Sequence, residues 1–299
     1  LHLTRESPAP CPVSPDPNVM QPSAVSHFAC ECLGVALLGF ALVGTAETQG
    51  PLAAQAVGLG LAAITYVVEP ASGAHLNPAV SLGHFICHHL HESSETSPAD
   101  DATQERTRAL VAVVAQILGG LAGAAGAWFA YGDSAASMLA AAADAIAPSD
   151  LSTSPAKLVA LFVGAFLLVF VHLHTTVGQA GTGFFGLAIG FALVASLVVF
   201  SSPLNPAVAL GLCLVRGLTG SGSFAETVDV LNLGLACAVP LLAAGLATLT
   251  VSPSDSPLTT LGAKLRVEAI GVGALVLALC ASSAAHGIQS ADGMSESFG

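Results

Sequence analysis

Charged residues are scarce in this chain of 299 residues, where Asp, Glu, Lys and Arg together make up 9%, against about 25% in a typical soluble domain. Cations are fewest, with 7 Lys and Arg against 19 Asp and Glu. Nucleic-acid binding is therefore not expected, because it relies on clustered cations that face phosphates. A soluble domain is excluded as well, since hydrophobic residues make up 54% of the chain and its mean hydropathy is +0.77.

Catalytic and metal-binding patterns are also missing. The 7 cysteines show no paired-ligand spacing, so they are interpreted as small buried residues rather than as a disulfide or zinc framework. His84, His88 and His91 share a helical face and could recruit a metal, but a solvated polar helix end is favoured. Glu31 and scattered histidines are too few for a membrane enzyme. We expect no enzyme activity, no metal and no cofactor.

Long apolar segments are what the chain has instead. A membrane-spanning helix needs about 20 mostly apolar residues, and its backbone polar groups must be paired within the helix. The sequence therefore predicts an all-α protein of the lipid bilayer with six transmembrane helices. These helices lie near 28–50, 52–70, 107–131, 156–177, 182–201 and 228–251. A shorter apolar segment near 267–285 is a possible additional helix.

The two ends of the chain differ from this central part. Residues 1–26 are rich in Pro and Ser and are predicted to be a disordered tail. Residues 252–299 form a linker and the additional apolar helix, in which residues 268–272 repeat the spacing of residues 31–35. Three interpretations stay open: an added helix, the start of a truncated second unit, or an accidental likeness. Because the chain begins at Leu1 rather than Met, it can also be a fragment.

The few cations predict an orientation. Most of them fall on one side of the membrane if the N-terminus is cytoplasmic, whereas only Lys157 and Arg216 fall on the other. Cytoplasmic loops carry an excess of Lys and Arg, so the sequence predicts a cytoplasmic N-terminus. The cations on the predicted cytoplasmic side are Arg5, Arg106, Arg108, Lys264 and Arg266.

An Asn-Pro-Ala triplet occurs twice, each time followed by Leu-Gly. The residues are Asn77, Pro78 and Ala79, and then Asn205, Pro206 and Ala207. The surroundings repeat too, since residues 31–40 and 161–170 share a Gly, a Leu-Leu pair and a Phe. The segment 27–251 thus divides into repeats of about 27–131 and 156–251. Because each repeat has three spans, the two must be inverted relative to each other.

Inversion gives the triplets a mechanical role. Proline suits the first helical turn and asparagine is a favoured N-cap, so each triplet is predicted to begin a short re-entrant half-helix. Inverted symmetry brings the two half-helices in from opposite faces, with their N-termini meeting near the midplane. Their positive dipole ends would repel cations, including protons, while the asparagine amides offer hydrogen bonds to neutral molecules in a lumen.

The segment Ser72–Gly83, which reads SGAHLNPAVSLG, resembles the first-repeat signature of the aquaporin and aquaglyceroporin (major intrinsic protein) family. Ala115, Gln116 and Gly119 are similar to the family pattern too, and the likeness covers about 28–251. It implies a passive channel for small neutral solutes such as water, glycerol, urea, ammonia or hydrogen peroxide. It also implies a homotetramer with one pore in each protomer.

The resemblance gives structural roles to Glu31 and His75. A carboxylate inside a span is costly unless it is partnered, and in the family this glutamate braces the re-entrant loop. Its counterpart in the second half is Leu161, so His172 and His174 are either substitutes or, as favoured, interfacial residues. His75 is expected to position the loop backbone. A pH gate is the alternative, because histidine titrates near neutrality.

The selectivity filter departs from the family. The arginine that normally follows the second triplet is replaced by Val208, and the resemblance places the other filter positions at Val57, Ser202 and either Leu193 or Leu197. Without a cation or an aromatic ring, this filter should be wider and less polar than a strict water filter. The alternatives are a non-conducting scaffold or junction protein of the same fold and a weakly ion-permeable channel. Cys213 would confer mercury sensitivity only if it lined the lumen.

Overall fold

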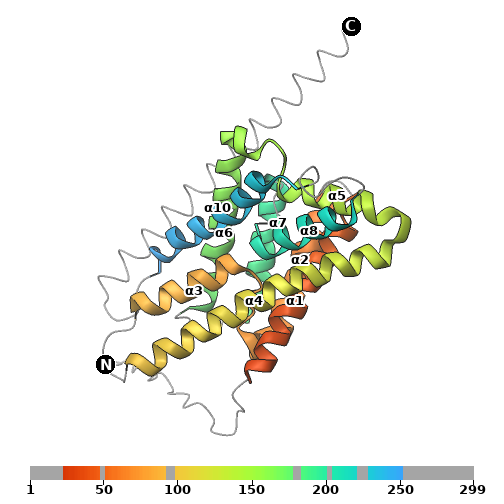
Figure 1. The fold of residues 1–299 in the computed structure, drawn as a ribbon. Coiled ribbons are helices and arrows are strands. Elements are labelled where there is room, and N and C mark those ends of the chain that lie inside the picture. The colour runs from red at the N-terminus through yellow and green to blue at the C-terminus, as the bar shows by residue number, and fades with distance from the viewer. Residues whose placement is uncertain are drawn as a thin grey trace, which may run out of the picture.

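The computed structural model describes residues 23–47, 51–91, 98–177, 183–200, 204–220 and 228–251. Every regular element in these ranges is a helix, as the sequence predicts (Figure 1). The helices are α1 (Ala24–Gly44), α2 (Pro51–Ser72), α3 (Pro78–His91), α4 (Pro98–Tyr131), α5 (Ala135–Ile146), α6 (Pro155–Thr176), α7 (Phe185–Phe200), α8 (Pro206–Thr219) and α10 (Val230–Thr248). Short 3₁₀ turns at Gly132–Ser134 and Leu151–Thr153 flank α5. Most of the predicted tail, Ser202 and the segment 252–299 lie outside the described residues.

Side-chain caps fix where several helices begin. The Ser23 hydroxyl accepts the Ser26 N–H at 3.1 Å, so α1 starts at Ala24 and residues 24–26 are helical rather than part of the tail. Ser154 accepts from Lys157 ahead of α6, and Asp229 accepts the Asn232 N–H at 3.0 Å ahead of α10. These bonds satisfy N–H groups that have no partner within the helix.

Helix length distinguishes most of the spanning elements from the half-helices. Five of the described helices are long and apolar enough to cross a membrane, whereas α7 has an apolar length of 16 residues. Helices α3 and α8 have 14 residues each. At a rise of about 1.5 Å per residue they are roughly 21 Å long, short of the roughly 30 Å of the hydrocarbon core. They can enter the membrane but cannot cross it alone.

The packing has the symmetry of two inverted repeats. In the first repeat α1 packs against α2 and α4, and in the second α6 packs against α7 and α10. Each half-helix packs against the last helix of the other repeat, α3 on α10 and α8 on α4. Helices α2 and α7, which correspond to each other, pack against each other. The predicted six-helix architecture with two half-helices is therefore confirmed for the described residues.

Glycines allow two close helix approaches, at the second half-helix and at the α2–α7 contact. A side chain on Gly58 of α2 would collide with the backbone of Gly190 on α7, and the reverse also holds. In the same way, Gly120 of α4 lies directly against the backbones of Ala207 and Gly211 on α8. Close approach of two backbones is a general use of small residues between membrane helices. These contacts fix the positions of α7 and of α8, the second half-helix.

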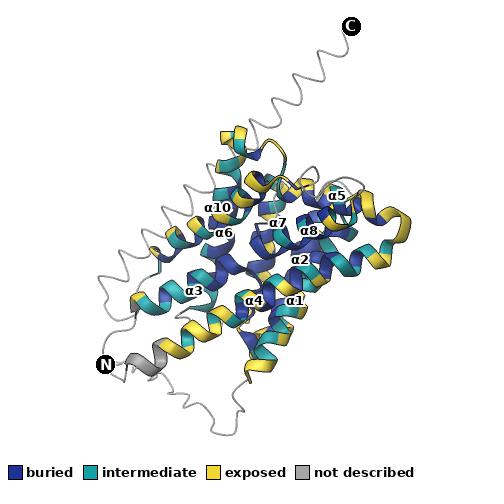
Figure 2. Ribbon diagram, viewed as in Figure 1, coloured by how far each residue is buried: buried dark blue, intermediate teal, exposed yellow. Residues whose placement is uncertain are grey.

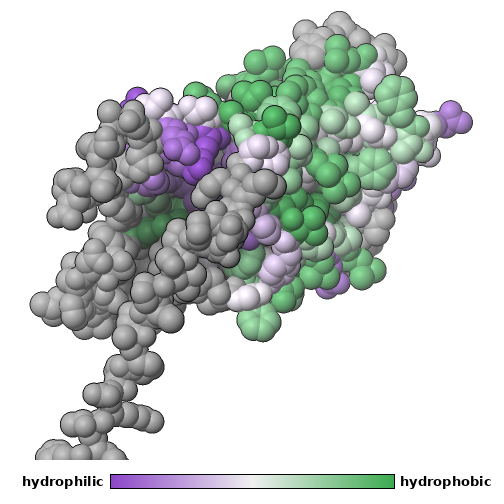
Figure 3. Space-filling view, turned by 90° about the horizontal axis from the view of Figure 1, so that it is seen from below, coloured by the Kyte–Doolittle hydropathy of each residue, from purple (hydrophilic) through white to green (hydrophobic). Residues whose placement is uncertain are grey.

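The outer surface of the helix bundle is largely hydrophobic, as in a protein surrounded by lipid. Buried residues gather in the middle of the bundle, and exposed ones are frequent at the helix ends (Figure 2). Large hydrophobic side chains such as Phe129, Val67 and Leu242 are exposed on the outside. Seen from below, hydrophobic residues cover most of the described surface and hydrophilic ones gather at one side (Figure 3). The outer wall therefore suits a bilayer.

Two features of the fold differ from the sequence analysis. Helix α4 begins at Pro98, well before the predicted start near residue 107, and Thr103, Gln104 and Arg106 in its early part are exposed. Helix α5 occupies a stretch to which no element was assigned. It packs on α8, α4 and α1, and buries Leu139 and Ile146 against them. The connection between the repeats thus contains a helix that packs over α8, the second half-helix.

Candidate pore

The two triplet loops adopt the same unusual backbone conformation. The residue before each asparagine is a leucine in the left-handed region, Leu76 with φ 53° and Leu204 with φ 57°. Ala74 is left-handed too, with φ 51°. Residues with a Cβ rarely adopt this conformation, which costs roughly 1–2 kcal/mol each. Contacts around the loops must therefore hold them in place.

The asparagines cap their own half-helices and close the two loops on each other. The Asn77 side-chain oxygen accepts the Ala79 N–H at 2.9 Å, and that of Asn205 accepts the Ala207 N–H at 3.1 Å. The amide nitrogen of Asn77 donates to the Leu204 carbonyl at 3.1 Å. That of Asn205 donates to the Leu76 carbonyl at 2.7 Å. The N-termini of α3 and α8 thus meet inside the bundle.

Glu31 of α1 holds the first loop. Its carboxylate is fully buried and accepts the backbone N–H groups of His75 at 3.0 Å and Leu76 at 2.7 Å. It also accepts the Ser72 hydroxyl at 2.7 Å. A buried carboxylate is stable only when such donors surround it. The bonds fix the strained backbone just before Asn77.

A side-chain network continues from Glu31 into the half-helix. The Gln116 amide of α4 donates to Glu31 at 2.7 Å and to the Ser81 hydroxyl at 2.9 Å. The Ser81 hydroxyl in turn lies 3.2 Å from Nδ1 of His75. Both amide hydrogens of Gln116 are used in this way, which fixes how the amide is turned. The network joins α1, α4, α3 and the loop into one unit.

The second loop is held differently. Leu161, at the position that corresponds to Glu31, is a buried apolar residue of the core and offers no acceptor. Among the described residues, the Leu204–Asn205 segment is bound through the amide of Asn77 and through its own cap. Among the described residues, no hydrogen bond joins His172 or His174 to that segment. His174 instead lies against Phe170 and its carbonyl, with Nδ1 at 2.9 Å.

Three histidine rings meet beside the first loop. His75 stacks on His84 of α3 with ring centroids 4.3 Å apart, and His84 meets the edge of His172 of α6 at 5.2 Å. The interpretation of His172 as interfacial is wrong, because its side chain is 2% exposed. His84 is half-buried and Nε2 lies 3.2 Å from the Thr176 hydroxyl, so a solvated position is wrong for it too. No set of described residues has the geometry to hold a metal ion.

A small central cavity lies at the meeting point of the two loops. Its volume is about 20 Å³, and both Asn77 and Asn205 line it. A cavity of this size holds about one water molecule. The rest of the wall is mostly apolar. The other lining residues are Leu38, Leu61, Thr65, Ala74, His75, Leu76, Val80, Leu168, Ile189 and Leu193.

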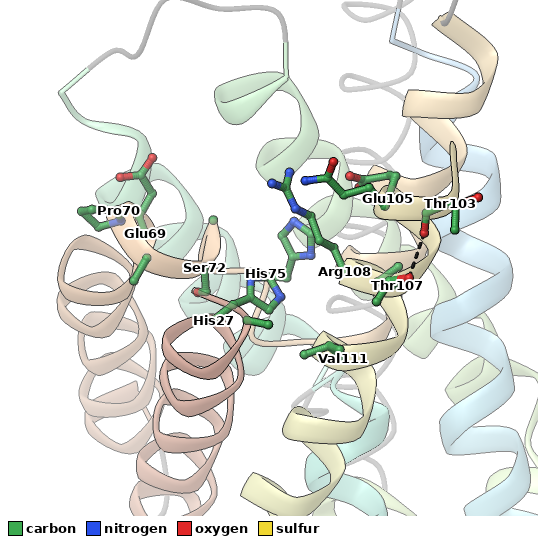
Figure 4. A pocket seen from close by; sticks show the side chains of 15 residues that line it. His27, Glu69, Pro70, Ser72, His75, Thr103, Glu105, Thr107, Arg108 and Val111 are labelled. Carbon is green, nitrogen blue, oxygen red and sulfur yellow. Dashed lines mark hydrogen bonds between the residues drawn. The ribbon is translucent and has the colours of Figure 1, made fainter. Parts of the chain in front are cut away.

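A vestibule of about 750 Å³ opens beyond it. It lies between the start of α1, the end of α2 and the first turns of α4. Glu69 lies on one side of it and Glu105 and Arg108 on the other, with His27 and His75 between them (Figure 4). Because His75 lines both cavities, it stands at the boundary between the vestibule and the constriction. Glu69, near the end of α2, therefore lines the mouth of this path.

The filter candidates divide into two groups. Leu193 lines the central cavity with the asparagines, whereas Leu197, one helical turn further along α7, does not. Val57 and Val208 are buried and lie outside that cavity lining as well. Ser202 lies outside the described residues. Cys213 is buried and lines neither of the two described cavities.

Sequence reasoning missed Thr65 and the contact between His84 and His172. Thr65 stands four residues after Leu61 and four before Glu69, a spacing that predicts a shared helix face. That signal was available once Glu69 was known to face the path. The histidine contact depends on how α3 packs against α6, which no local pattern reveals.

Two half-helices that meet at capped asparagines inside an apolar six-helix bundle define a membrane channel fold. A family model described as major intrinsic protein matches residues 21–217, and the chain belongs to this family. It is 29% identical over 226 residues to Aquaporin Z from Brucella melitensis biotype 1, covering 74% of this chain and 85% of that protein. Its structure is similar to the X-ray structure of the aquaglyceroporin from Plasmodium falciparum, with a TM-score of 0.57, 18% identity, and coverage of 80% of this chain and 100% of that one.

Proposed function

We propose that the protein is a passive channel for water and other small neutral solutes. The main support is that Asn77 and Asn205 each donate a hydrogen bond to the other's loop. These bonds bring two amide groups and two helix N-termini to one narrow cavity. Each amide nitrogen has two hydrogens and uses one of them for the opposite loop. The second can bind the oxygen of a passing molecule. The vestibule supplies the approach from one side.

The same geometry disfavours ions. The positive ends of the α3 and α8 dipoles point at the cavity, and a cation there would also lose its hydration shell. A neutral molecule meets neither penalty. The filter positions that the family resemblance proposes are Val57, Ser202, Val208 and either Leu193 or Leu197. None of them adds a charge, so the dipoles and asparagines alone would exclude cations.

We place the N-terminus and the vestibule on the cytoplasmic side. Arg108 lines the vestibule, and Arg106 lies in the same exposed turns of α4. At the other end of the bundle, Lys157 forms an ion pair with Asp150 at 2.6 Å, and Arg216 pairs with Asp144. By the predicted topology these are the two cations at that end against five on the vestibule side, in keeping with the positive-inside bias, which counts Lys and Arg. A homotetramer with one pore in each protomer is proposed from the family.

Stopped-flow light scattering on proteoliposomes tests this function. An impermeant osmolyte measures water permeability, and glycerol and urea gradients measure solute entry. We expect water and at least one solute to exceed empty vesicles, without current in planar bilayers. Permeability to water alone would contradict the wide filter. Ionic current would favour the ion-channel alternative, and absence of every flux would favour a scaffold or junction role.

A further inference from the structure

The wall of the central cavity contains one polar side chain that the asparagine pair does not explain. Thr65 of α2 lines the cavity together with Asn77 and Asn205, and its side chain is 1% exposed. Its hydroxyl is buried and has no hydrogen-bond partner among the described residues. A buried hydroxyl without a partner is costly, and such groups usually bind something at a functional site.

Other threonines in these helices behave differently. The Thr45 hydroxyl donates to the Ala41 carbonyl, Thr175 to Val171 and Thr248 to Gly245, each at 2.7–2.8 Å. This bond to the preceding turn is the usual way for a helical threonine to satisfy its hydroxyl. Thr65 does not make it. Its hydroxyl is therefore available on the cavity side.

The position of Thr65 in its helix supports this orientation. Leu61, Thr65 and Glu69 follow one another at intervals of four residues, so they lie on the same face of α2. Leu61 lines the constriction and Glu69 lines the vestibule. Thr65 thus stands between them on the path. The corresponding face of α7 is apolar, with Ile189 and Leu193 in the cavity wall.

We propose that Thr65 is a specificity-determining residue that binds a water molecule in the constriction as a third polar partner beside Asn77 and Asn205. The inference rests on the proposed channel function. The two amides only donate hydrogen bonds to a permeant, whereas a hydroxyl can also accept one. A molecule with both a donor and an acceptor, and small enough for about 20 Å³, gains most from this set. Water has these properties.

The test compares Thr65→Val, which keeps the shape, with Thr65→Ser, which keeps the hydroxyl. Thr248→Val is the matched control, because Thr248 is equally buried but lines neither described cavity. Water permeability per reconstituted protein should fall by roughly threefold to tenfold in Thr65→Val, the factor supplied by one hydrogen bond between neutral groups. Thr65→Ser and Thr248→Val should stay within about twofold of the wild type.

The activation energy of water permeation provides a readout that does not depend on how much protein folds and inserts. It should rise in Thr65→Val and stay unchanged in Thr65→Ser. Equal permeability and activation energy in the wild type and Thr65→Val would overturn the role of Thr65 while leaving the channel function intact. A wild type that conducts no solute would overturn both proposals. A loss equally large in Thr248→Val would assign the effect to helix packing and overturn the role of Thr65.

Discussion

Asn77 and Asn205 are bound to each other's loops in a reciprocal way. The amide of each donates to the carbonyl of the leucine that precedes the other, at 3.1 and 2.7 Å. Those leucines are both in the left-handed region. Each asparagine therefore stabilises the strained backbone that positions its counterpart, and the two repeats are coupled at the constriction.

This reciprocity predicts non-additive effects on stability. Asn77→Ala and Asn205→Ala should each lower the unfolding free energy by about 2 kcal/mol, about half from the lost cap and half from the lost interloop bond. The double variant should differ from the sum of the two by more than ~0.5 kcal/mol, because each asparagine is bound to the residue that precedes the other. Unfolding in detergent measures all three variants. As a control, Ser23→Ala removes the distant α1 cap and should add to Asn205→Ala; additivity of the asparagine pair would contradict the coupling.

Glu31→Gln should disrupt the first loop although it hardly changes the size of the side chain. The carboxylate accepts from Ser72, His75, Leu76 and Gln116, so an amide NH₂ would face donors and leave buried groups unpaired. We expect a loss of about 3 kcal/mol in stability together with reduced water flux. The measurements are thermal unfolding in detergent and stopped-flow permeability.

A matched control for this change is Glu47→Gln. Glu47 is exposed and accepts a bond from the Ser137 hydroxyl at 2.8 Å. The stability of that variant should stay within about 0.5 kcal/mol of the wild type. Equal effects of the two substitutions would show that the burial of Glu31 is irrelevant to the loop.

The sequence predicted the spans and the half-helices because both leave local signals. Long apolar segments have no alternative in a bilayer but a helix. The capped start of α8 could likewise be read from Asn205 and Pro206, since asparagine caps and proline begins helices through contacts within the same turn. Duplication then gave the inverted arrangement without knowledge of any contact.

The features that escaped prediction depend on distant contacts. The alanine-rich stretch of α5 is too short to span a membrane, and only its packing on α8 gives it a place. In the sequence, His172 is a polar residue near the end of a helix. Its burial becomes clear only from the packing of α3, which places His84 against it. Which of Leu193 and Leu197 lines the central cavity with the asparagines also depends on the position of α7 along α2. Local spacing puts both on one face but does not fix their depth.

Gly211→Ala should displace the second half-helix. A methyl group at Gly211 would collide with the backbone of Gly120, which cannot move like a flexible side chain. We expect a loss of about 1–3 kcal/mol in stability and lower water permeability, because α8 carries Asn205.

In contrast, nothing lies within 4 Å of the corresponding methyl position at Gly245 in α10. Gly245→Ala should leave permeability unchanged and raise stability by up to about 1 kcal/mol. Tolerance of alanine at Gly211 would contradict the close α4–α8 contact.

Val208→Arg tests whether the missing cation widens the range of solutes. Val208 is fully buried directly after the second triplet, and its N–H lies 3.4 Å from the Asn205 side-chain oxygen. An arginine there would add both bulk and charge, so entry of glycerol and urea should fall by roughly tenfold, equivalent to about 1.4 kcal/mol, while water flux is retained. Val208→Met serves as the control because it adds length without charge. If Met reduces solute entry as much as Arg does, size rather than charge limits the filter. If the Arg variant admits every solute that the wild type admits, Val208 does not line the filter, and the selectivity must come from the asparagine constriction alone.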